Sequence, residues 1–466
     1  MRISNIKFFK IPISFFILKI IIISKIYPIK PLIVLPFNIK TKYQQSDEFF
    51  SKYLSTNFEI GEPPQNIEAE IDFQESDFHL SYTRKYIPLL YNKTKSNKYI
   101  NTSLYRITTK NFASGCKANE SFYFFEDEKL INKQKYENIS FFMATNMDKL
   151  FCAILGFELS WKGIRGFIGS LKNSKAINSY TWTLKFNSID NGLLIIGEEP
   201  HVYNNTYDES KLKYTKIYMY KNYFSWSISF SNVIYGELIY KKNIIGIIRP
   251  DIKGLIAPLD YYENLEKIYL KAYLENNICQ KIEIYEKNIT NNDYFDEQKM
   301  LFYKIECDKN EFSLDKIENF PVLKFINIPL NYSFNFHGKD LFKEENNKYI
   351  FQIYISDIKF WYIGRLFLYK YQFIYNEDNK LIGLYTGFKN NSNNNNNIFK
   401  IILIIFFSFM LIFIFFILYK KIRLLNRKNK KYANELEDNF SYKNDFLKES
   451  KNMKDKNNNS LFEKND

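Results

Sequence analysis

Hydrophobic and polar residues follow three different patterns along the chain. Residues 11–23 form a mostly apolar run near the N-terminus, and residues 401–418 form a second run near the C-terminus. Between them, residues 44–388 contain short stretches rich in β-branched and aromatic side chains, separated by turns of Asn, Asp, Gly and Lys. This pattern predicts a mainly β region made of many short strands, with no long amphipathic helix.

The C-terminal apolar run is expected to cross a membrane. Residues 398–419 reach the ~20 residues that a helix needs to traverse the hydrocarbon core, and Ser408 is the only polar residue within 401–418. Seven Lys or Arg residues follow within 420–431, and such residues remain on the cytoplasmic side. A single-pass type I topology follows, with the middle region in a secretory or endosomal lumen or at the cell surface. The alternative is a buried core helix, but soluble helices rarely lack a polar face over this length.

The N-terminal apolar run has the form of a signal peptide. Three basic residues precede residues 11–23, as in a basic region followed by an apolar one. Lys19 interrupts the run, so an uncleaved signal anchor is the alternative for residues 1–30. Cleavage is expected somewhere between Ser24 and Lys42.

Two polar segments flank the predicted membrane span. Residues 389–397 are almost entirely Asn, which indicates a short flexible linker. Residues 420–466 are charged and Asn-rich, with little apolar surface to bury, which indicates a disordered cytoplasmic tail. Its basic start can also bind anionic lipid.

The charge distribution argues against nucleic-acid binding. The net charge is +14, but residues 1–43 contribute +8 and residues 420–466 contribute +5. The long middle region is therefore close to neutral, whereas a nucleic-acid groove needs its positive excess on the folded domain. The charge is a topology signal beside the two apolar runs.

Cysteines and glycosylation sequences agree with an exported middle region. Cys116, Cys152, Cys279 and Cys307 all lie within it, and an even number in an oxidising compartment suggests two disulfides. Three pairings are open, of which Cys116 with Cys152 and Cys279 with Cys307 is the simplest. Glycosylation acceptor sequences also occur there, at Asn92, Asn101, Asn119, Asn138, Asn204, Asn288, Asn331 and Asn390.

A specific motif appears near the start of this region. Residues 60–65 read I-G-E-P-P-Q, and Asp72 follows seven residues after Gln65. This stretch resembles the first active-site region of pepsin-like aspartic proteases, in which I-G-T-P-P-Q precedes a strand and a D-T-G-S-S loop. The ungapped register puts Asp72 on the first catalytic aspartate.

Four later stretches resemble the same family in the same order. They are residues 163–169 (G-I-R-G-F-I-G), 191–197 (N-G-L-L-I-I-G), 226–236 (W-S-I-S-F-S-N-V-I-Y-G) and 360–371 with 379–384. Together the five stretches are distributed over residues 50–387, nearly the whole middle region. The resemblance implies a bilobal pepsin-like fold with a cleft between two β lobes, residues 44–235 and 236–388. The alternative is an unrelated β-rich ectodomain.

The two catalytic loops depart from the family pattern. An aspartic protease activates water with two carboxylates that share one proton. In the first loop Asp72 and Ser76 are kept, but Phe73 and Gln74 replace the Thr and Gly. In the second loop, an ungapped register anchored on Pro258 puts Arg249 where the family has its second aspartate.

Asp251 is a weak candidate for that second aspartate. It follows Arg249 by two residues, which on a strand means the same face but ~7 Å further along. That separation is too long for two carboxylates to share a proton. An Arg at position 249 facing Asp72 would pair with it and keep it ionised.

We therefore expect a protease-like membrane glycoprotein that is catalytically inactive and binds a peptide or protein in its cleft. The alternative is a divergent, active membrane-anchored aspartic endopeptidase, which requires Asp251 or another carboxylate beside Asp72. A purely structural surface antigen is a third reading. No metal-binding or nucleotide-binding motif occurs and the three His residues are scattered, so no metal or cofactor is expected.

Overall fold

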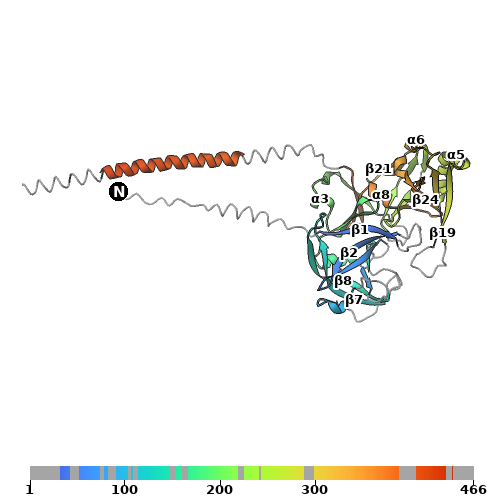
Figure 1. The fold of residues 1–466 in the computed structure, drawn as a ribbon, viewed down its shortest axis with the longest axis horizontal. Coiled ribbons are helices and arrows are strands. Elements are labelled where there is room, and N and C mark those ends of the chain that lie inside the picture. The colour runs from blue at the N-terminus through green and yellow to red at the C-terminus, as the bar shows by residue number, and fades with distance from the viewer. Residues whose placement is uncertain are drawn as a thin grey trace, which may run out of the picture. The chain divides into compact units, whose positions relative to one another are not determined.

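A computed structural model of the 466-residue chain describes residues 32–41, 52–73, 78–81, 91–102, 107–108, 114–146, 153–159, 166–218, 225–240, 243–287, 299–387, 406–436 and 443. The chain divides into two compact units, Met1–Lys389 and Asn390–Asp466 (Figure 1). Both expected lobes fall within the first unit. The predicted signal region 1–30, the linker 389–397 and the tail beyond residue 443 lie outside the described residues.

The first unit is mainly β, as the alternating sequence pattern predicted. Strand β16 shows the pattern directly, because its side chains alternate between buried and half-buried positions. Strand β11 is buried along nearly its whole length, as expected for a continuous apolar run inside a packed sheet. In Figure 1, β1, β2, β7 and β8 gather on one side of this unit, and β19, β24, α5 and α6 on the other.

The largest sheet has fourteen strands and includes both early and late parts of the chain. Its spatial order is β12 (Leu212–Lys216), β27 (Leu381–Tyr385), β26 (Phe373–Asn376), β10 (Thr181–Ser188), β11 (Asn191–Ile196), β1 (Ile33–Thr41), β2 (Lys52–Ile60), β3 (Gln65–Asp72), β9 (Ala153–Gly156), β4 (Phe78–Ser81), β8 (Lys133–Asn146), β7 (Ser114–Phe125) and β5 (Ile100–Asn101), with β6 (Ile107–Thr108) beside β7.

Two further sheets come from the later part of the chain. The nine-stranded sheet has the order β13 (Ser227–Phe230), β16 (Ile244–Ile248), β25 (Trp361–Ile363), β17 (Leu255–Pro258), β24 (Ile353–Ser356), β19 (Lys299–Asp308), β23 (Lys348–Phe351) and β22 (Phe342–Glu345), with β18 (Cys279–Lys287) beside β19. The four-stranded sheet has the order β15 (Leu238–Tyr240), β14 (Asn232–Tyr235), β20 (Leu323–Asn327) and β21 (Tyr332–Phe336).

Short helices complete the first unit. They are η1 (Lys93–Lys95), α2 (Phe167–Asn173), α3 (Pro200–Tyr203), η2 (Glu209–Lys211), α6 (Leu314–Glu318), α7 (Gly338–Leu341) and α8 (Arg365–Lys370). One longer helical segment runs without interruption through α4 (Leu259–Leu265), the π-helix η3 (Glu266–Leu270) and α5 (Lys271–Glu275). The expectation of no long helix in residues 44–388 is therefore wrong for residues 259–275. Buried Tyr261, Leu265 and Leu270 form the inner face of this segment.

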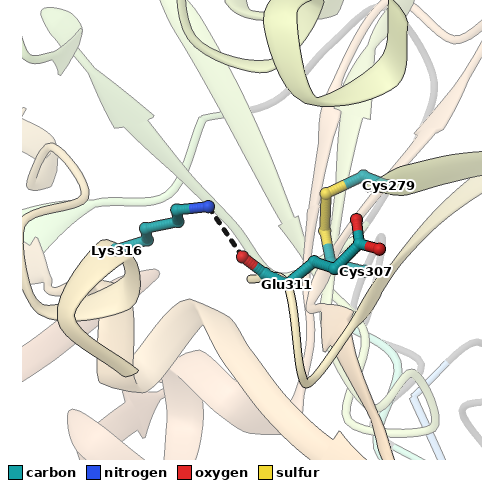
Figure 2. Close-up of a disulfide and its surroundings, with 4 residues drawn as sticks. All are labelled: Cys279, Cys307, Glu311 and Lys316. Carbon is teal, nitrogen blue, oxygen red and sulfur yellow. Dashed lines mark hydrogen bonds between the residues drawn. A yellow bond between two sulfur atoms is a disulfide. The ribbon is translucent and has the colours of Figure 1, made fainter. Parts of the chain in front are cut away.

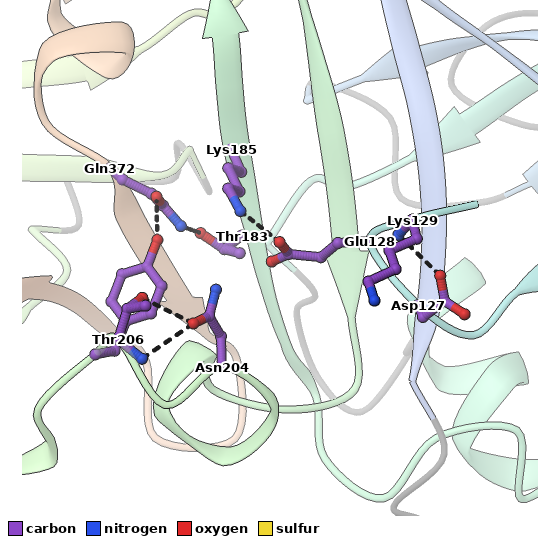
Figure 3. Close-up of polar contacts among 9 residues, drawn as sticks. Asp127, Glu128, Lys129, Thr183, Lys185, Asn204, Thr206 and Gln372 are labelled. Atoms are coloured by element: carbon purple, nitrogen blue, oxygen red, sulfur yellow. Dashed lines mark hydrogen bonds and ion pairs between the residues drawn. The ribbon is translucent and has the colours of Figure 1, made fainter. Parts of the chain in front are cut away.

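The chain's last strands return to its first sheet. Strand β26 pairs with β10 through Thr181 and Asn376, and the Thr183 hydroxyl donates to the carbonyl oxygen of Phe373 at 2.6 Å. In Figure 3, Gln372 reaches Thr183, and two residues further along the same strand Lys185 is paired with Glu128. The contacts of β26 and Gln372 with β10 join residues almost 200 positions apart, so the first and last parts of the unit fold together.

Strand β1 lies earlier in the chain than the predicted start of the first lobe at residue 44. It pairs with β11 and with β2, and Ile33, Val34 and Leu35 are fully buried. The interval expected to contain a cleavage site therefore overlaps a central strand. Cleavage within Ile33–Thr41 would remove part of that strand, and the cleavage itself stays a prediction.

One of the two predicted disulfides is present. Cys279 and Cys307 are directly opposite each other on β18 and β19 and are bonded. Figure 2 shows this bridge beside Glu311, whose carbonyl oxygen accepts a hydrogen bond from the Lys316 ammonium at 2.6 Å. Cys116 is a half-buried thiol beside the Tyr99 hydroxyl. Cys152 lies outside the described residues, so its predicted pairing with Cys116 stays a prediction.

The described part of the second unit is a helix over residues 406–436. No helix among the described residues has both the length and the apolar character needed to cross a membrane, and residues 398–405 of the predicted span lie outside the description. The helix continues through residues 420–436, which were expected to be disordered. Lys, Arg and Leu favour helix formation, and they dominate this part of the segment.

Candidate functional site

Asp72 lies at the end of a strand that is part of a three-strand arrangement. Strand β3 runs parallel to β9, with Ile71 opposite Leu155 and Asp72 opposite Gly156. The chain then returns as β4, which is antiparallel to β9 and places Phe78 opposite Leu155. Leu155 is thus flanked by the strand that carries Asp72 on one side and by the returning strand on the other.

The same arrangement occurs a second time around Arg249. Strand β16 runs parallel to β25, with Ile248 opposite Ile363, so Arg249 directly follows the paired residue. The chain returns as β17, which is antiparallel to β25 and places Leu255 opposite Ile363. Six residues separate Arg249 from Leu255, as six separate Asp72 from Phe78. Asp72 and Arg249 therefore occupy equivalent positions in two copies of one strand motif.

Asp72 itself is half-buried at the end of β3. Its carbonyl oxygen accepts a hydrogen bond from the Phe157 amide at 2.7 Å, which fixes the backbone at the strand end. Residues 74–77, the rest of the first predicted loop, lie outside the described residues. The predicted roles of Gln74 and Ser76 therefore stay predictions.

Phe73 replaces a hydroxyl-bearing residue of the family pattern and packs in an aromatic cluster. Its ring lies 5.4 Å from that of Trp182 and 6.1 Å from that of Phe157, and only 7% of the residue is exposed. Trp182 also stacks on Tyr375 at 3.8 Å. The position next to Asp72 therefore contributes apolar packing in place of a polar contact.

Arg249 forms a two-pronged ion pair with Asp251. Its Nε donates to one carboxylate oxygen at 2.8 Å and its second terminal nitrogen donates to the other at 2.6 Å. The guanidinium also lies over the Tyr362 ring, 5.5 Å from its centre. Burial opposes the charged form, but the attraction of Asp251 outweighs burial and raises the pKa of Arg249, and the Asp72 carboxylate acts in the same direction. The two equivalent positions are thus close enough to interact electrostatically.

Asp251 occupies a turn, which corrects the strand geometry assumed from the sequence. Strand β16 ends at Ile248, and the amide of Ile252 donates to the carbonyl oxygen of Arg249 at 3.0 Å. Pro250 follows Arg249 and lacks the amide hydrogen that a continuing strand would use. The carboxylate of Asp251 therefore folds back onto Arg249 and does not project further along a strand.

Arg365 is a third charged residue of this region, and the sequence interpretation did not single it out. The side chain is fully buried, and one terminal nitrogen donates to the carbonyl oxygens of Pro250 and Asp251 at 3.2 and 2.8 Å. Its guanidinium is 3.9 Å from the carboxylate of Asp190. Burial lowers the pKa of Arg365 to about 10, which still leaves it charged at neutral pH.

A signal for Arg365 was present in the sequence. The family motif W-I-L-G-D carries an aspartate after its glycine, whereas this chain has Arg365 after Gly364. The space at Gly364 is restricted, because an added Cβ would lie 2.0 Å from the carbonyl oxygen of Gly254. The glycine thus lets α8 approach the turn, and the Arg365 backbone amide donates to the carbonyl oxygen of Ile252 at 2.8 Å.

Trp226 connects the two copies of the motif. Its indole Nε1 donates to the carbonyl oxygen of Phe157 at 2.8 Å, and Phe157 directly follows β9. The carbonyl oxygen of Trp226 accepts from the Ile248 amide, also at 2.8 Å, and Ile248 directly precedes Arg249. One fully buried residue therefore joins the strand ends that carry Asp72 and Arg249.

The arrangement brings together two carboxylates and two guanidinium groups. The formal charges of Asp72, Arg249, Asp251 and Arg365 cancel, and Asp190 adds a third carboxylate beside Arg365. Both oxygens of Asp251 accept hydrogen bonds from Arg249. Within the described ranges, no three His, Cys, Asp or Glu side chains are grouped as metal ligands. His201, on α3, contacts Tyr385, and His337 caps α7, while the side chain of His79 is outside the description.

Comparison with known proteins adds no family assignment. No established family profile matches the sequence, and no curated protein matches it at a significant level.

Proposed function

We propose that this chain is a membrane-anchored relative of the pepsin-like aspartic proteases whose bilobal luminal part binds a peptide or protein without cleaving it. The observation that carries the proposal is the equivalence of Asp72 and Arg249 in the two strand motifs. In this family, each lobe contributes one aspartate from the same position of the same loop. A repeated motif with one aspartate and one arginine supports a related fold with an altered centre.

The altered centre supports loss of catalysis. Peptide hydrolysis by this family needs one carboxylate to accept a proton from water while the other carries a proton. The attraction between Arg249 and Asp251 favours the ionised form of that carboxylate, and both its oxygens are engaged at 2.6 and 2.8 Å. This pairing disfavours a proton shared between Asp251 and Asp72.

The preserved frame supports a binding function. Trp226 still ties the two strand ends together, and the aromatic cluster of Phe73, Trp182 and Tyr375 packs the first loop. A scaffold that keeps these contacts after losing a catalytic carboxylate has kept its shape, which is what a ligand would recognise. The proposed ligand is a peptide or protein in the cleft between the lobes, with the ectodomain in a secretory or endosomal lumen or at the cell surface.

A peptide-retention experiment tests the proposal. The full chain in detergent micelles would be immobilised and exposed to a mixed peptide library between pH 4 and 7, and bound and unbound peptides identified by mass spectrometry. We expect a subset of peptides to be retained and recovered intact, both by the natural chain and by Asp72→Asn. Absence of any retained peptide contradicts the binding function. Peptides with new termini that depend on Asp72 support the active endopeptidase instead.

A further inference from the structure

The helix of residues 406–436 has an apolar seam in its C-terminal half. The chain is strongly basic from Lys420 on. From Leu418 on, five apolar side chains and one amide recur at alternating spacings of four and three residues: Leu418, Ile422, Leu425, Asn429, Tyr432 and Leu436. This spacing keeps all six on one stripe of a helix. The apolar members are 40–66% exposed within this single chain, so the seam has no covering element among the described residues.

We propose that residues 418–436 form a parallel two-stranded coiled coil with the same segment of a second copy of this chain. In the heptad notation of coiled coils, Ile422, Asn429 and Leu436 fall at a positions, and Leu418, Leu425 and Tyr432 at d positions. Ile at a with Leu at d favours two strands over three or four. The stretch spans about 28 Å of helix axis.

Asn429 identifies the partner as an identical helix in register. A single Asn at an a position lowers stability but fixes register and two-stranded state, because its amide is satisfied only by the amide of the facing chain. A lipid surface or an unrelated apolar groove would leave that amide buried without a partner, which is unfavourable. The seam therefore fits a second copy better than either alternative.

The charged residues agree with a parallel orientation. The seven Lys and Arg residues of 420–431 lie outside the a, d and e positions. In a parallel pair, Lys421 and Lys428 at g face Asn426 and Ala433 at e of the partner, so no like charges meet. In an antiparallel pair, the g lysines would face each other and repel. Their aliphatic stems can also cover the edges of the apolar seam.

Site-specific cross-linking tests this proposal. Leu425→Cys puts a thiol in the seam at d, and Arg427→Cys puts one on the outer face at f of the same turn. Full-length chains carrying either change, and the unsubstituted chain as background, would be reconstituted in phosphatidylcholine vesicles and oxidised with copper phenanthroline. We expect a covalent dimer severalfold more abundant for Leu425→Cys than for Arg427→Cys, with the unsubstituted chain at background.

Three outcomes overturn the proposal. Equal cross-linking at both positions indicates random collision, and no dimer at either position indicates a monomeric helix. Protection of Leu425→Cys from a water-soluble maleimide, only when the vesicles contain phosphatidylserine, assigns the seam to the lipid surface. A second variant guards against loss of folding: Asn429→Val should keep the helix but shift the full chain in detergent micelles from dimers toward higher oligomers, as measured by sedimentation. An unchanged pattern for Asn429→Val contradicts the role of Asn429.

Discussion

The indole Nε1 of Trp226 donates a 2.8 Å hydrogen bond to the carbonyl oxygen of Phe157, and this bond links the two copies of the strand motif. Phe157 in turn donates its amide to the carbonyl oxygen of Asp72 at 2.7 Å. Trp226 is 1% exposed, so water cannot replace the bond if it is lost. Integrity of the centre therefore depends on a residue that does not belong to either loop.

Replacing Trp226 by Phe should destabilise the protein more than the same change elsewhere. Trp226→Phe leaves the buried Phe157 carbonyl without its donor, which should lower the free energy of unfolding by about 1–3 kcal/mol beyond the packing loss. Trp361→Phe is the matched control, because the Trp361 indole nitrogen is buried without a hydrogen-bond acceptor among the described residues. Urea unfolding measures both. Equal losses would contradict the importance of the Trp226–Phe157 bond.

The Arg249–Asp251 pair should show strong energetic coupling. A double-mutant cycle of Arg249→Gln and Asp251→Asn is expected to give a coupling free energy of about 1–3 kcal/mol, since the pair is two-pronged and partly buried. The exposed Lys271–Glu275 pair on α5, with nitrogen and oxygen 3.6 Å apart, is the control and should couple by less than about 0.5 kcal/mol. Additive effects at Arg249 and Asp251 would refute the pairing.

The Cys279–Cys307 disulfide should contribute substantially to stability. The bridge closes a loop of 28 residues, for which the chain-entropy account gives about 3–4 kcal/mol. The double variant Cys279→Ala with Cys307→Ala should lose about that much free energy of unfolding in non-reducing buffer. With dithiothreitol added to both, the natural chain and the variant should have nearly equal free energies of unfolding. A difference that persists unchanged under reduction would show that packing, rather than the cross-link, is responsible.

Glu306 should make stability depend on acidic pH. Burial disfavours its charge, but hydrogen bonds from Lys304 and Lys348 outweigh burial and lower the pKa of Glu306 below its usual value. A carboxylate with a lowered pKa stabilises the fold above its unfolded pKa of about 4.3, and this contribution disappears as the pH falls through the folded pKa.

The comparison of Glu306→Gln with the natural chain isolates this effect. The variant should be less stable at pH 7, and the difference should shrink as the pH falls below about 4.3. Glu263→Gln, at an exposed position of α4, serves as the control and should change the free energy of unfolding by less than about 0.5 kcal/mol. A Glu306→Gln difference that grows toward acidic pH would contradict the assigned ion pairs.

Local sequence patterns were sufficient to predict a mainly β region of many short strands, but not which strands pair. Strands β10 and β11, which are neighbours in the chain, pair directly. Nothing local indicated that Ile33–Thr41 would pair with Asn191–Ile196, because that contact depends on the packing of the whole sheet. Residues 33–41 also continue an apolar N-terminal stretch, so the interval expected to contain the cleavage site included them.

The helical segment 259–275 was missed although its signal was present. Tyr261, Leu265, Tyr269 and Tyr273 recur every four residues, a spacing typical of a helix with one buried face. Aromatic residues favour strands, and their abundance led to a strand interpretation of this segment in place of a helical one.

For the candidate site, the ungapped sequence register placed Arg249 at the position equivalent to Asp72. It did not predict the backbone conformation around Arg249. Strand geometry placed Asp251 ~7 Å beyond Arg249, whereas the chain turns at Pro250. That turn is held by hydrogen bonds from α8, which the local sequence does not reveal. Arg365 escaped notice because it lies more than a hundred residues away in the chain. Its contacts with the turn follow from β25 and β16 being neighbours in the sheet.

The central claim is that the centre containing Asp72 and Arg249 does not hydrolyse peptides. The most direct measurement is the rate of cleavage of a mixed peptide library by the purified full chain between pH 3 and 7, with and without pepstatin, compared with Asp72→Asn. The account predicts that the natural chain and the variant are indistinguishable and that pepstatin has no effect. Pepstatin-sensitive cleavage that disappears in Asp72→Asn would contradict it.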